Sequence, residues 1–337
     1  MSKLINDDLD SLLEDTSRSF YLTLKALPSK IRSQLGMLYL LARIADTIAD
    51  SNSPDTAHML SALEQYNQRI QGQTNELPDL SILAELQTNP AEKKLLFNVE
   101  KAVDCMGSFS KIDQKRMREC LEIIIGGQAL DLRRFGQAND STVLALQDDK
   151  ELDDYAYRVA GSVGEFWTHM TLDHLFKTNS VKKAKLFETG VRFGKALQLI
   201  NILRDIPEDL ILGRCYIPEP ILSEQGLKPD DLSDTKNMQK FRPIYDNYID
   251  VAAAHLDAAV EYIDMLPYRQ FRLRGACMLP VLIGQRTLNL LRRNNVLDGE
   301  NRIKVTRTEI KQLKKKMIYS LLTKKRTRKL LEKNRDS

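Results

Sequence analysis

Two pairs of aspartates interrupt otherwise apolar segments of this 337-residue chain. The first pair is Asp46 and Asp50, and the same spacing recurs at Asp205 and Asp209. Residues four apart on a helix share one face, so each pair would bring two carboxylates close together. Two like charges at that distance stay ionised only with a cation nearby. Mg²⁺ suits such a pair, because it binds one or two carboxylates together with water and phosphate oxygens.

An arginine stands close before each pair. Arg43 lies about one helical turn before Asp46, Arg204 directly precedes Asp205, and Arg214 follows the second motif. The planar guanidinium group matches phosphate geometry. A single pair of this kind is usually a solvated helix face, but its repetition within apolar helices favours a functional site. We therefore expect two facing metal sites that bind a diphosphate and assist its loss to an allylic carbocation.

Helical periodicity dominates the rest of the chain, and glycine (15) and proline (11) are sparse. Long helices are expected over residues 31–50, 113–135, 151–177, 181–206, 238–265 and 270–293. No alternating strand pattern or fixed repeat is present. The sequence therefore predicts an all-α fold in a single domain of about ten helices. Pro207, inside the second aspartate motif, is expected to kink or end its helix.

Charge is distributed unevenly. Residues 302–337 carry 14 Lys/Arg and three acidic residues, a net charge of +11. The net charge of the whole chain is +4, so residues 1–301 carry a net charge of −7. We therefore divide the chain into a catalytic domain, residues 1–306, and a basic C-terminal tail, residues 307–337. The polar N-terminus, the scattered cysteines and the absence of a long apolar run predict a cytoplasmic protein.

The basic tail mixes its charges with apolar residues such as Met317, Leu321 and Leu331. A helix of this kind can lie on an anionic membrane surface, which predicts a peripheral contact with the cytoplasmic membrane face. A disordered, solubilising tail is the alternative. Nucleic acid would fit the charge, but the tail lacks interleaved aromatic residues and any nucleic-acid-binding motif, so no nucleic-acid partner is expected.

Several separated blocks resemble the squalene/phytoene synthase family, from Thr16 to about Thr306. The blocks are Ser17-Arg18-Ser19-Phe20, the first motif with Tyr39, Arg43, Asp46 and Asp50, the segment from Tyr155 to Gly164, and the second motif with Gln198, Asn201, Arg204, Asp205, Asp209 and Arg214. Ala156 replaces the cysteine that is usual in the family. The resemblance implies the helical isoprenoid synthase fold with a central cavity.

The resemblance also implies roles for individual residues. The catalytic residues would be Tyr155, Tyr39 and Arg43, and the metal ligands Asp46, Asp50, Asp205 and Asp209. The diphosphate substrate would be bound by Ser17, Arg18, Ser19, Phe20, Arg43, Gln198, Arg204 and Arg214, and a nicotinamide cofactor by Asn201, Arg302 and Lys304. Arg302 and Lys304 lie in a segment that resembles the basic NADPH-binding segment of squalene synthases, although they also begin the basic tail.

The expected reaction is the head-to-head condensation of two farnesyl diphosphates through presqualene diphosphate, with Mg²⁺, followed by reduction with NADPH to squalene. The alternative is a dehydrosqualene, phytoene or presqualene diphosphate synthase that omits the reduction. A non-catalytic helical binding protein would be expected to have lost Arg43 and Arg204 with the aspartates. A cyclising terpene synthase or a head-to-tail prenyltransferase would not explain the Ser17–Phe20 and Tyr155–Gly164 blocks.

Overall fold

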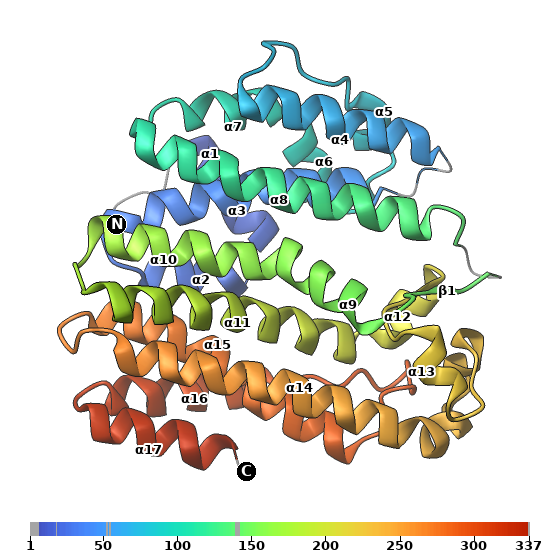
Figure 1. The fold of residues 1–337 in the computed structure, drawn as a ribbon. Helices are drawn as coiled ribbons and strands as arrows, with labels where there is room; N and C mark the ends of the chain where they lie inside the picture. Colours follow the sequence, from blue (N-terminus) through green and yellow to red (C-terminus); the bar gives the residue numbers. More distant parts are fainter. Residues whose placement is uncertain (1–6, 18, 52, 54, 139–141, 336–337) are drawn as a thin grey trace. The chain divides into compact units, whose positions relative to one another are not determined.

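The computed structural model describes residues 7–17, 19–51, 53, 55–138 and 142–335, and almost all regular structure in them is helical (Figure 1). The α-helices are α1 (Asp7–Ser17), α2 (Ser19–Ala26), α3 (Ser29–Ala49), α4 (Thr56–Gln71), α5 (Ser81–Glu85), α6 (Pro90–Leu96), α7 (Val99–Met106), α8 (Lys111–Phe135), α9 (Asp149–Ala156), α10 (Ser162–His174), α11 (Ser180–Arg204), α12 (Ile206–Ile211), α13 (Glu219–Ser223), α14 (Met238–Met265), α15 (Phe271–Arg293), α16 (Arg307–Ser320) and α17 (Lys324–Arg335). Strands β1 (Leu144–Ala145) and β2 (Arg214–Cys215) form one short parallel pair, with Leu144 opposite Arg214. The predicted all-α class is confirmed.

Five of the six long helices lie within two residues of their predicted bounds, as α3, α8, α11, α14 and α15. The segment 151–177 is instead divided into α9, a π-helical turn (Tyr157–Gly161) and α10. The described residues form seventeen α-helices rather than about ten. Six of the additional helices, α2, α5, α6, α7, α12 and α13, have only five to eight residues, too few turns for their periodicity to be recognised in a sequence.

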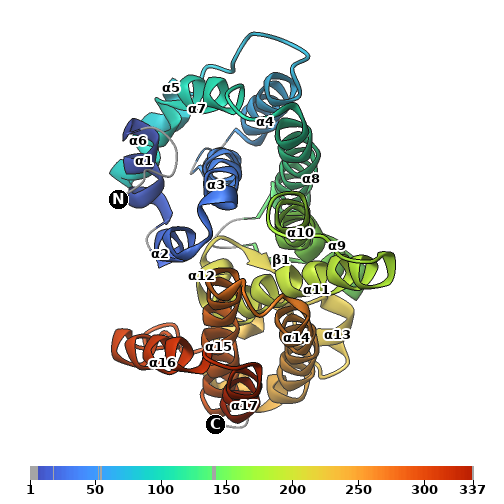
Figure 2. The same cartoon turned by 90° about the vertical axis from the view of Figure 1, so that its left-hand side faces the viewer.

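Contacts divide the chain into two compact units, which are described separately: unit 1 is residues 1–136 with 165–178, and unit 2 is residues 137–164 with 179–337. In unit 1, α3 lies at the centre and packs against α1, α2, α4, α6, α7 and α8 (Figure 2). Its apolar residues point in almost every direction and are buried, among them Leu38, Leu41 and Ile44. A helix that is apolar nearly all round requires such a position.

The long partner helix of α3 has a well-defined start. The Ser110 hydroxyl accepts a hydrogen bond from the backbone N–H of Asp113, which satisfies one of the free donors at the start of α8. In unit 2, the Asn179 side chain accepts from the N–H of Lys182 and begins α11 in the same way. These caps fix where the two helices that carry the polar site residues begin.

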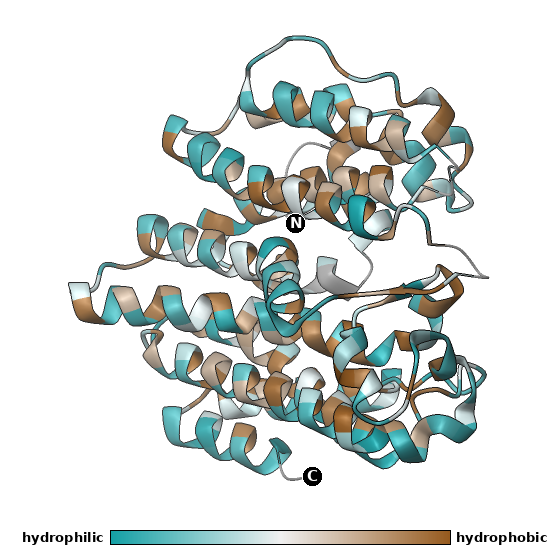
Figure 3. Cartoon of the chain, turned by 45° about the vertical axis from the view of Figure 1, so that its right-hand side comes forward, coloured by the Kyte–Doolittle hydropathy of each residue, from teal (hydrophilic) through white to brown (hydrophobic). Residues whose placement is uncertain are grey.

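Unit 2 is built on α11, α14 and α15, which pack side by side (Figure 1). The two helices of the basic tail, α16 and α17, pack against α15 and against each other. Although α17 is mostly hydrophilic (Figure 3), its Thr327 and Leu331 side chains are buried. No helix in the described part of the chain is both long enough and apolar enough to cross a membrane.

Candidate active site

The first aspartate motif lies at the C-terminal end of α3, in unit 1. Asp46 is on the last turn, and Asp50 caps the helix by donating its backbone N–H to the Asp46 carbonyl at 2.9 Å. Arg43 forms ion pairs with the Asp46 carboxylate and with Glu92 on α6. Gln128 on α8 donates to Asp46 Oδ1 at 2.9 Å. Three helices therefore contribute side chains around one carboxylate.

The pKa of Asp46 is raised to about 6, chiefly because burial disfavours its charged form and secondly because Asp50 is close. Arg43 and Gln128 act in the opposite direction but do not compensate. Burial also disfavours the charge of Arg43, yet the two carboxylates of Asp46 and Glu92 leave its pKa above the ordinary value. The first motif thus carries more negative charge than its own arginine neutralises.

Tyr39 joins this motif to the N-terminal helices. Its hydroxyl donates to the backbone carbonyl of Thr16 at 3.4 Å, and burial raises its pKa. The buried Ser17 hydroxyl donates to the Leu13 carbonyl within α1. The other predicted members of this block, namely Arg18 and the side chains of Ser19 and Phe20, lie outside the described residues.

The second motif spans a break between two helices of unit 2. Asp205 ends α11, and Asp209 lies in α12, which has Pro207 in its first turn. The backbone N–H of Asp209 donates to the Asp205 carbonyl at 3.0 Å, and that of Asp205 donates to Asn201 at 2.9 Å. The expectation that Pro207 ends the helix is confirmed. On α11, the Asn201 side chain is exposed and Gln198 is half-buried.

Both carboxylate oxygens of Asp205 accept hydrogen bonds from arginines. Arg204 donates to Oδ1 at 2.8 Å and to Oδ2 at 2.5 Å, and Arg302 donates to Oδ1 at 2.7 Å. Arg302 also pairs with Glu208, at 2.9 Å. Burial raises the pKa of Asp205, but the two arginines outweigh it, so the pKa lies below the ordinary value. Arg302 therefore lies on the second motif, whereas Lys304 is exposed.

Tyr155, on α9, stacks on Tyr216. Their ring centroids are 4.8 Å apart, with 17° between the planes, and the Tyr216 hydroxyl donates to that of Tyr155 at 3.3 Å. Tyr216 directly follows β2, whose pairing with β1 holds this stretch of chain. Tyr216 also lines a cavity of about 10 Å³ together with Arg214 and Asp209. Tyr155 is thus tied to the segment that carries the arginine following the second motif.

Two glycines, Gly164 in the Tyr155–Gly164 block and Gly194 on α11, allow two backbone segments to pack in close contact. A Cβ on Gly164 would lie 2.0 Å from the carbonyl oxygen of Gly190 on α11. A Cβ on Gly194 would lie equally close to the carbonyl of Ala160, in the π-helical turn. These distances are far below van der Waals contact, so only glycine fits. Such π-turns are rare and occur often at functional sites.

Comparison with known proteins identifies the family. The model of the family described as "Squalene/phytoene synthase" matches residues 13–309. This chain is a squalene/phytoene synthase family member. The "Bifunctional lycopene cyclase/phytoene synthase" of Aspergillus oryzae (strain ATCC 42149 / RIB 40) is 30% identical over 261 residues, which cover 76% of this chain but only 42% of that protein.

Solved structures of similar fold agree with the helical architecture. One, described as TcSQS with the ligand E5700, has a TM-score of 0.79 and 20% identity, covering 97% of this chain and 90% of that one. A dehydrosqualene synthase has a TM-score of 0.63 and 20% identity, covering 94% and 95%. The isoprenoid synthase fold that the sequence blocks implied is therefore confirmed.

Three residues around the family motifs were not assigned a role from the sequence: Glu92, Gln128 and Tyr216. Gln128 is the one polar side chain in the segment 123–130 of α8, which is otherwise apolar or glycine, and that isolation is a signal in the sequence. Glu92 gave none, since α6 is only seven residues long. Tyr216 lies two residues after Arg214, but its stacking on Tyr155 depends on the β1–β2 pairing, which no local pattern shows.

The donor set suits Mg²⁺. Among the described residues no group of three or more His, Cys, Asp or Glu side chains is arranged to hold a metal. Mg²⁺ commonly uses one or two carboxylates, with water and phosphate completing its octahedron, so pairs suffice. The excess negative charge at Asp46 favours a cation there. At Asp205 an incoming cation would have to displace a guanidinium group.

Proposed function

We propose that this chain condenses two farnesyl diphosphates head to head into presqualene diphosphate, releasing one diphosphate and one proton. The observation that carries the proposal is the family match over residues 13–309, since it includes both aspartate motifs and the Tyr155 block. Two separate diphosphate-binding motifs suit a reaction in which two diphosphate groups must be bound.

In this proposal Asp46 and Asp50 hold Mg²⁺ at the first motif, and Asp205 and Asp209 at the second. Bound Mg²⁺ would neutralise the diphosphate as its bond to carbon breaks. Gln128 and Glu92 keep Asp46 and Arg43 in place before substrate arrives. Arg43 and Arg204 are already turned toward the motif carboxylates, from which they can reach a diphosphate bound at the same carboxylates. Ser17 and Gln198 remain proposed substrate contacts.

We further propose that NADPH reduces presqualene diphosphate to squalene. In this step a hydride passes from NADPH to the carbon skeleton, the second diphosphate leaves, and NADP⁺ forms. Support comes from Arg302, whose guanidinium lies 2.7 Å from Asp205 Oδ1. The basic segment with Lys304 therefore begins beside a diphosphate motif, where a cofactor phosphate and the intermediate would have to meet. Asn201 is the third proposed cofactor contact.

A second candidate omits the reduction and loses a proton to give dehydrosqualene or phytoene, or stops at presqualene diphosphate. One observation favours it: the Aspergillus oryzae relative carries the name phytoene synthase. Under this candidate Arg302 serves only to neutralise Asp205 and Glu208.

Product analysis separates the two candidates. The full chain is incubated with farnesyl diphosphate and Mg²⁺, with and without NADPH, and the products are identified by mass spectrometry. We expect presqualene diphosphate or dehydrosqualene without NADPH and squalene with it. In a Lys304→Gln variant the KM for NADPH should rise while presqualene diphosphate formation is unchanged, with Lys228→Gln as the charge-matched control. If NADPH leaves the product unchanged, the reductive proposal is wrong and the second candidate stands.

The proposed location is the cytoplasm. The basic tail, residues 307–337, is proposed to contact the membrane that would receive a hydrocarbon product.

A further inference from the structure

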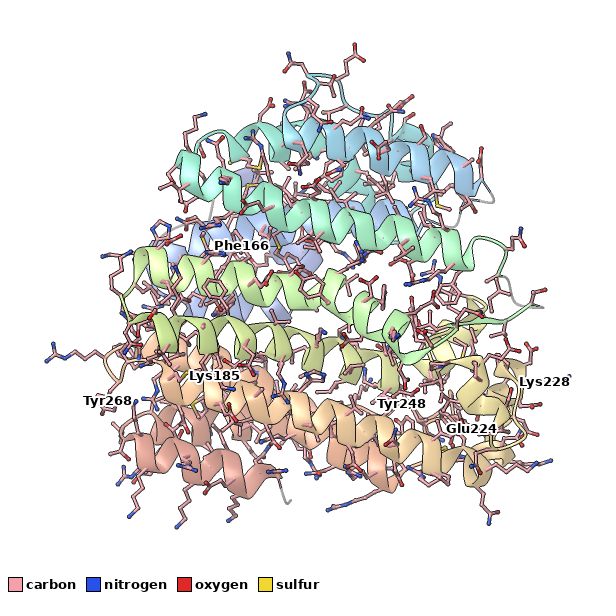
Figure 4. The ribbon with its side chains drawn as sticks, in the orientation of Figure 1. Phe166, Lys185, Glu224, Lys228, Tyr248 and Tyr268 are labelled. Atoms are coloured by element: carbon pink, nitrogen blue, oxygen red, sulfur yellow. The ribbon has the colours of Figure 1, made fainter. Side chains whose placement is uncertain are left out.

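Five large apolar side chains form an exposed cluster in unit 2, here called the apolar corner: Tyr268, Phe271, Ile318, Tyr319 and Leu322, each between 49% and 64% exposed. Tyr268, labelled in Figure 4, lies in the turn between α14 and α15, and Phe271 begins α15. Ile318 and Tyr319 lie in the last turn of α16, and Leu322 follows the helix. The Tyr268 hydroxyl donates to the Leu322 carbonyl, which joins the two segments. Single exposed apolar residues are ordinary, whereas a cluster of them marks an interaction surface.

The corner is held on a rigid base. Behind it, Leu313 and Met317 of α16 are buried, and Gly275 of α15 leaves room for the neighbouring Leu321 side chain. Arg274 is buried and donates to the Thr327 hydroxyl of α17 at 2.7 Å. The inner faces of α16 and α17 are therefore occupied by α15, and only their outer faces are available to a partner.

This packing alters the surface that the sequence indicated for the tail. Leu331 was part of the expected apolar stripe, but its side chain is buried and its carbonyl accepts from Gln285 on α15 at 3.1 Å. The exposed apolar residues are instead at the end of α16, in the α14–α15 turn and at the first residue of α15. The surface is thus composite, and α17 supports it from behind.

The charge around the apolar corner has one sign. Residues 310–331 contain nine Lys/Arg and no Asp or Glu. On α16, Lys314 and Lys315 precede Ile318 by four and three residues and follow Lys311 by three and four, so these four residues share one outward face, and Leu322 follows in the turn after the helix. None of these three lysines forms an ion pair with another described residue. Their charges are available to a negatively charged partner.

We propose that the apolar corner and the adjoining lysines dock this protein onto the surface of an anionic lipid bilayer. Ile318 and Leu322 enter the acyl boundary, the tyrosines lie at headgroup level, and the lysines contact lipid phosphates. Apolar side chains beside cations on one face match an anionic bilayer, which offers an acyl layer directly beneath a layer of phosphate groups. The proposal gives the membrane contact proposed above a definite surface, and it does not depend on the reaction catalysed.

Flotation with lipid vesicles tests the proposal, without substrate, so that a failure of the proposed activity does not affect the result. The full chain is mixed with neutral phosphatidylcholine vesicles or with vesicles that also contain phosphatidylglycerol. We expect flotation with the anionic vesicles only, weakened by salt. Lys314→Gln with Lys315→Gln should lower the partition coefficient by at least about tenfold, since each cation contributes about fivefold near an anionic surface.

Matched controls remove the same charge or add the same charge elsewhere. The control for the lysine variant is Lys228→Gln with Lys240→Gln. Lys240 is in the first turn of α14, about 40 Å along the helix from the end near Tyr268, and Lys228 precedes that helix. This variant should float like the natural chain. Ile318→Glu with Leu322→Glu should abolish flotation, whereas Ile82→Glu with Leu86→Glu, at an exposed site on and beside α5, should not. Circular dichroism verifies that each variant folds.

Three results would overturn the proposal. The first is equal flotation with neutral vesicles, and the second is flotation of the Ile318/Leu322 variant like that of the natural chain. The third is a natural chain that does not float and that forms a dimer in sedimentation velocity, while the Ile318/Leu322 variant is a monomer. The apolar corner would then be a contact between two copies of the chain.

Discussion

Replacing Asp46 by asparagine should stabilise the substrate-free protein while it destroys the first metal motif. The carboxylate lies beside Asp50 and is partly removed from water, so its ionisation is unfavourable in the folded chain. Asparagine keeps a side chain of the same shape but carries no charge. A site that is costly to the empty protein and useful only with its cation is a common compromise between stability and function.

The sign and size of the effect follow from the pKa, which rises from 3.8 to about 6. The folded chain then binds the proton more tightly than the unfolded chain, so the penalty is absent below about pH 4 and complete above about pH 6 to 7. A rise of this size corresponds to at most about 3 kcal/mol. Because the side chain is 31% exposed, we expect about 1–2 kcal/mol after screening by solvent.

Thermal unfolding at pH 8 and pH 5, without Mg²⁺, measures this effect. The Asp46→Asn variant should melt about 1–3 °C higher at pH 8, and the gain should shrink at pH 5. Glu76→Gln, on an exposed loop, is the control and should melt like the natural chain. A lower melting temperature for Asp46→Asn at pH 8 would show that its bonds to Arg43 and Gln128 outweigh the charge repulsion.

Three further changes have predictable results in thermal unfolding. Gly164→Ala places a Cβ 2.0 Å from the Gly190 carbonyl oxygen and should cost about 2–3 kcal/mol, whereas Gly226→Asn, at φ +64° in open space, should cost under about 0.5 kcal/mol. Tyr216→Phe keeps the ring stack and should cost less than about 1 kcal/mol, but Tyr216→Ala about 3–5 kcal/mol. Burial and neighbouring cations lower the pKa of His255, so stability should fall as the pH drops through about 6.5, and His255→Gln should flatten that dependence.

The long helices could be predicted because each repeats its apolar pattern over five turns or more. The short ones could not, because α5, α12 and α13 have five or six residues. The π-helical turn from Tyr157 to Gly161 was also missed. Its Ala160 carbonyl lies against Gly194 on α11, and a contact between residues so far apart in the chain leaves no local pattern.

The site was predicted where charge and spacing act within one element. Arg43 with Asp46, and Arg204 with Asp205, are local pairs, and both are present. The partners that come from other helices or segments could not be predicted from the sequence. Gln128 approaches Asp46 from α8, and Arg302 approaches Asp205 from a segment 97 residues away. Arg302 was assigned to a cofactor because its neighbours in sequence, rather than in space, suggested that role.

The stoichiometry of the reaction tests the central claim most directly. The full chain is given farnesyl diphosphate and Mg²⁺ with NADPH, and substrate consumed, diphosphate released and product formed are measured together. We predict two farnesyl diphosphates consumed and two diphosphates released for each squalene, with activity lost in Asp46→Asn and Asp205→Asn. Consumption of one farnesyl diphosphate per product, as in cyclisation, or unchanged turnover in both variants would contradict the account.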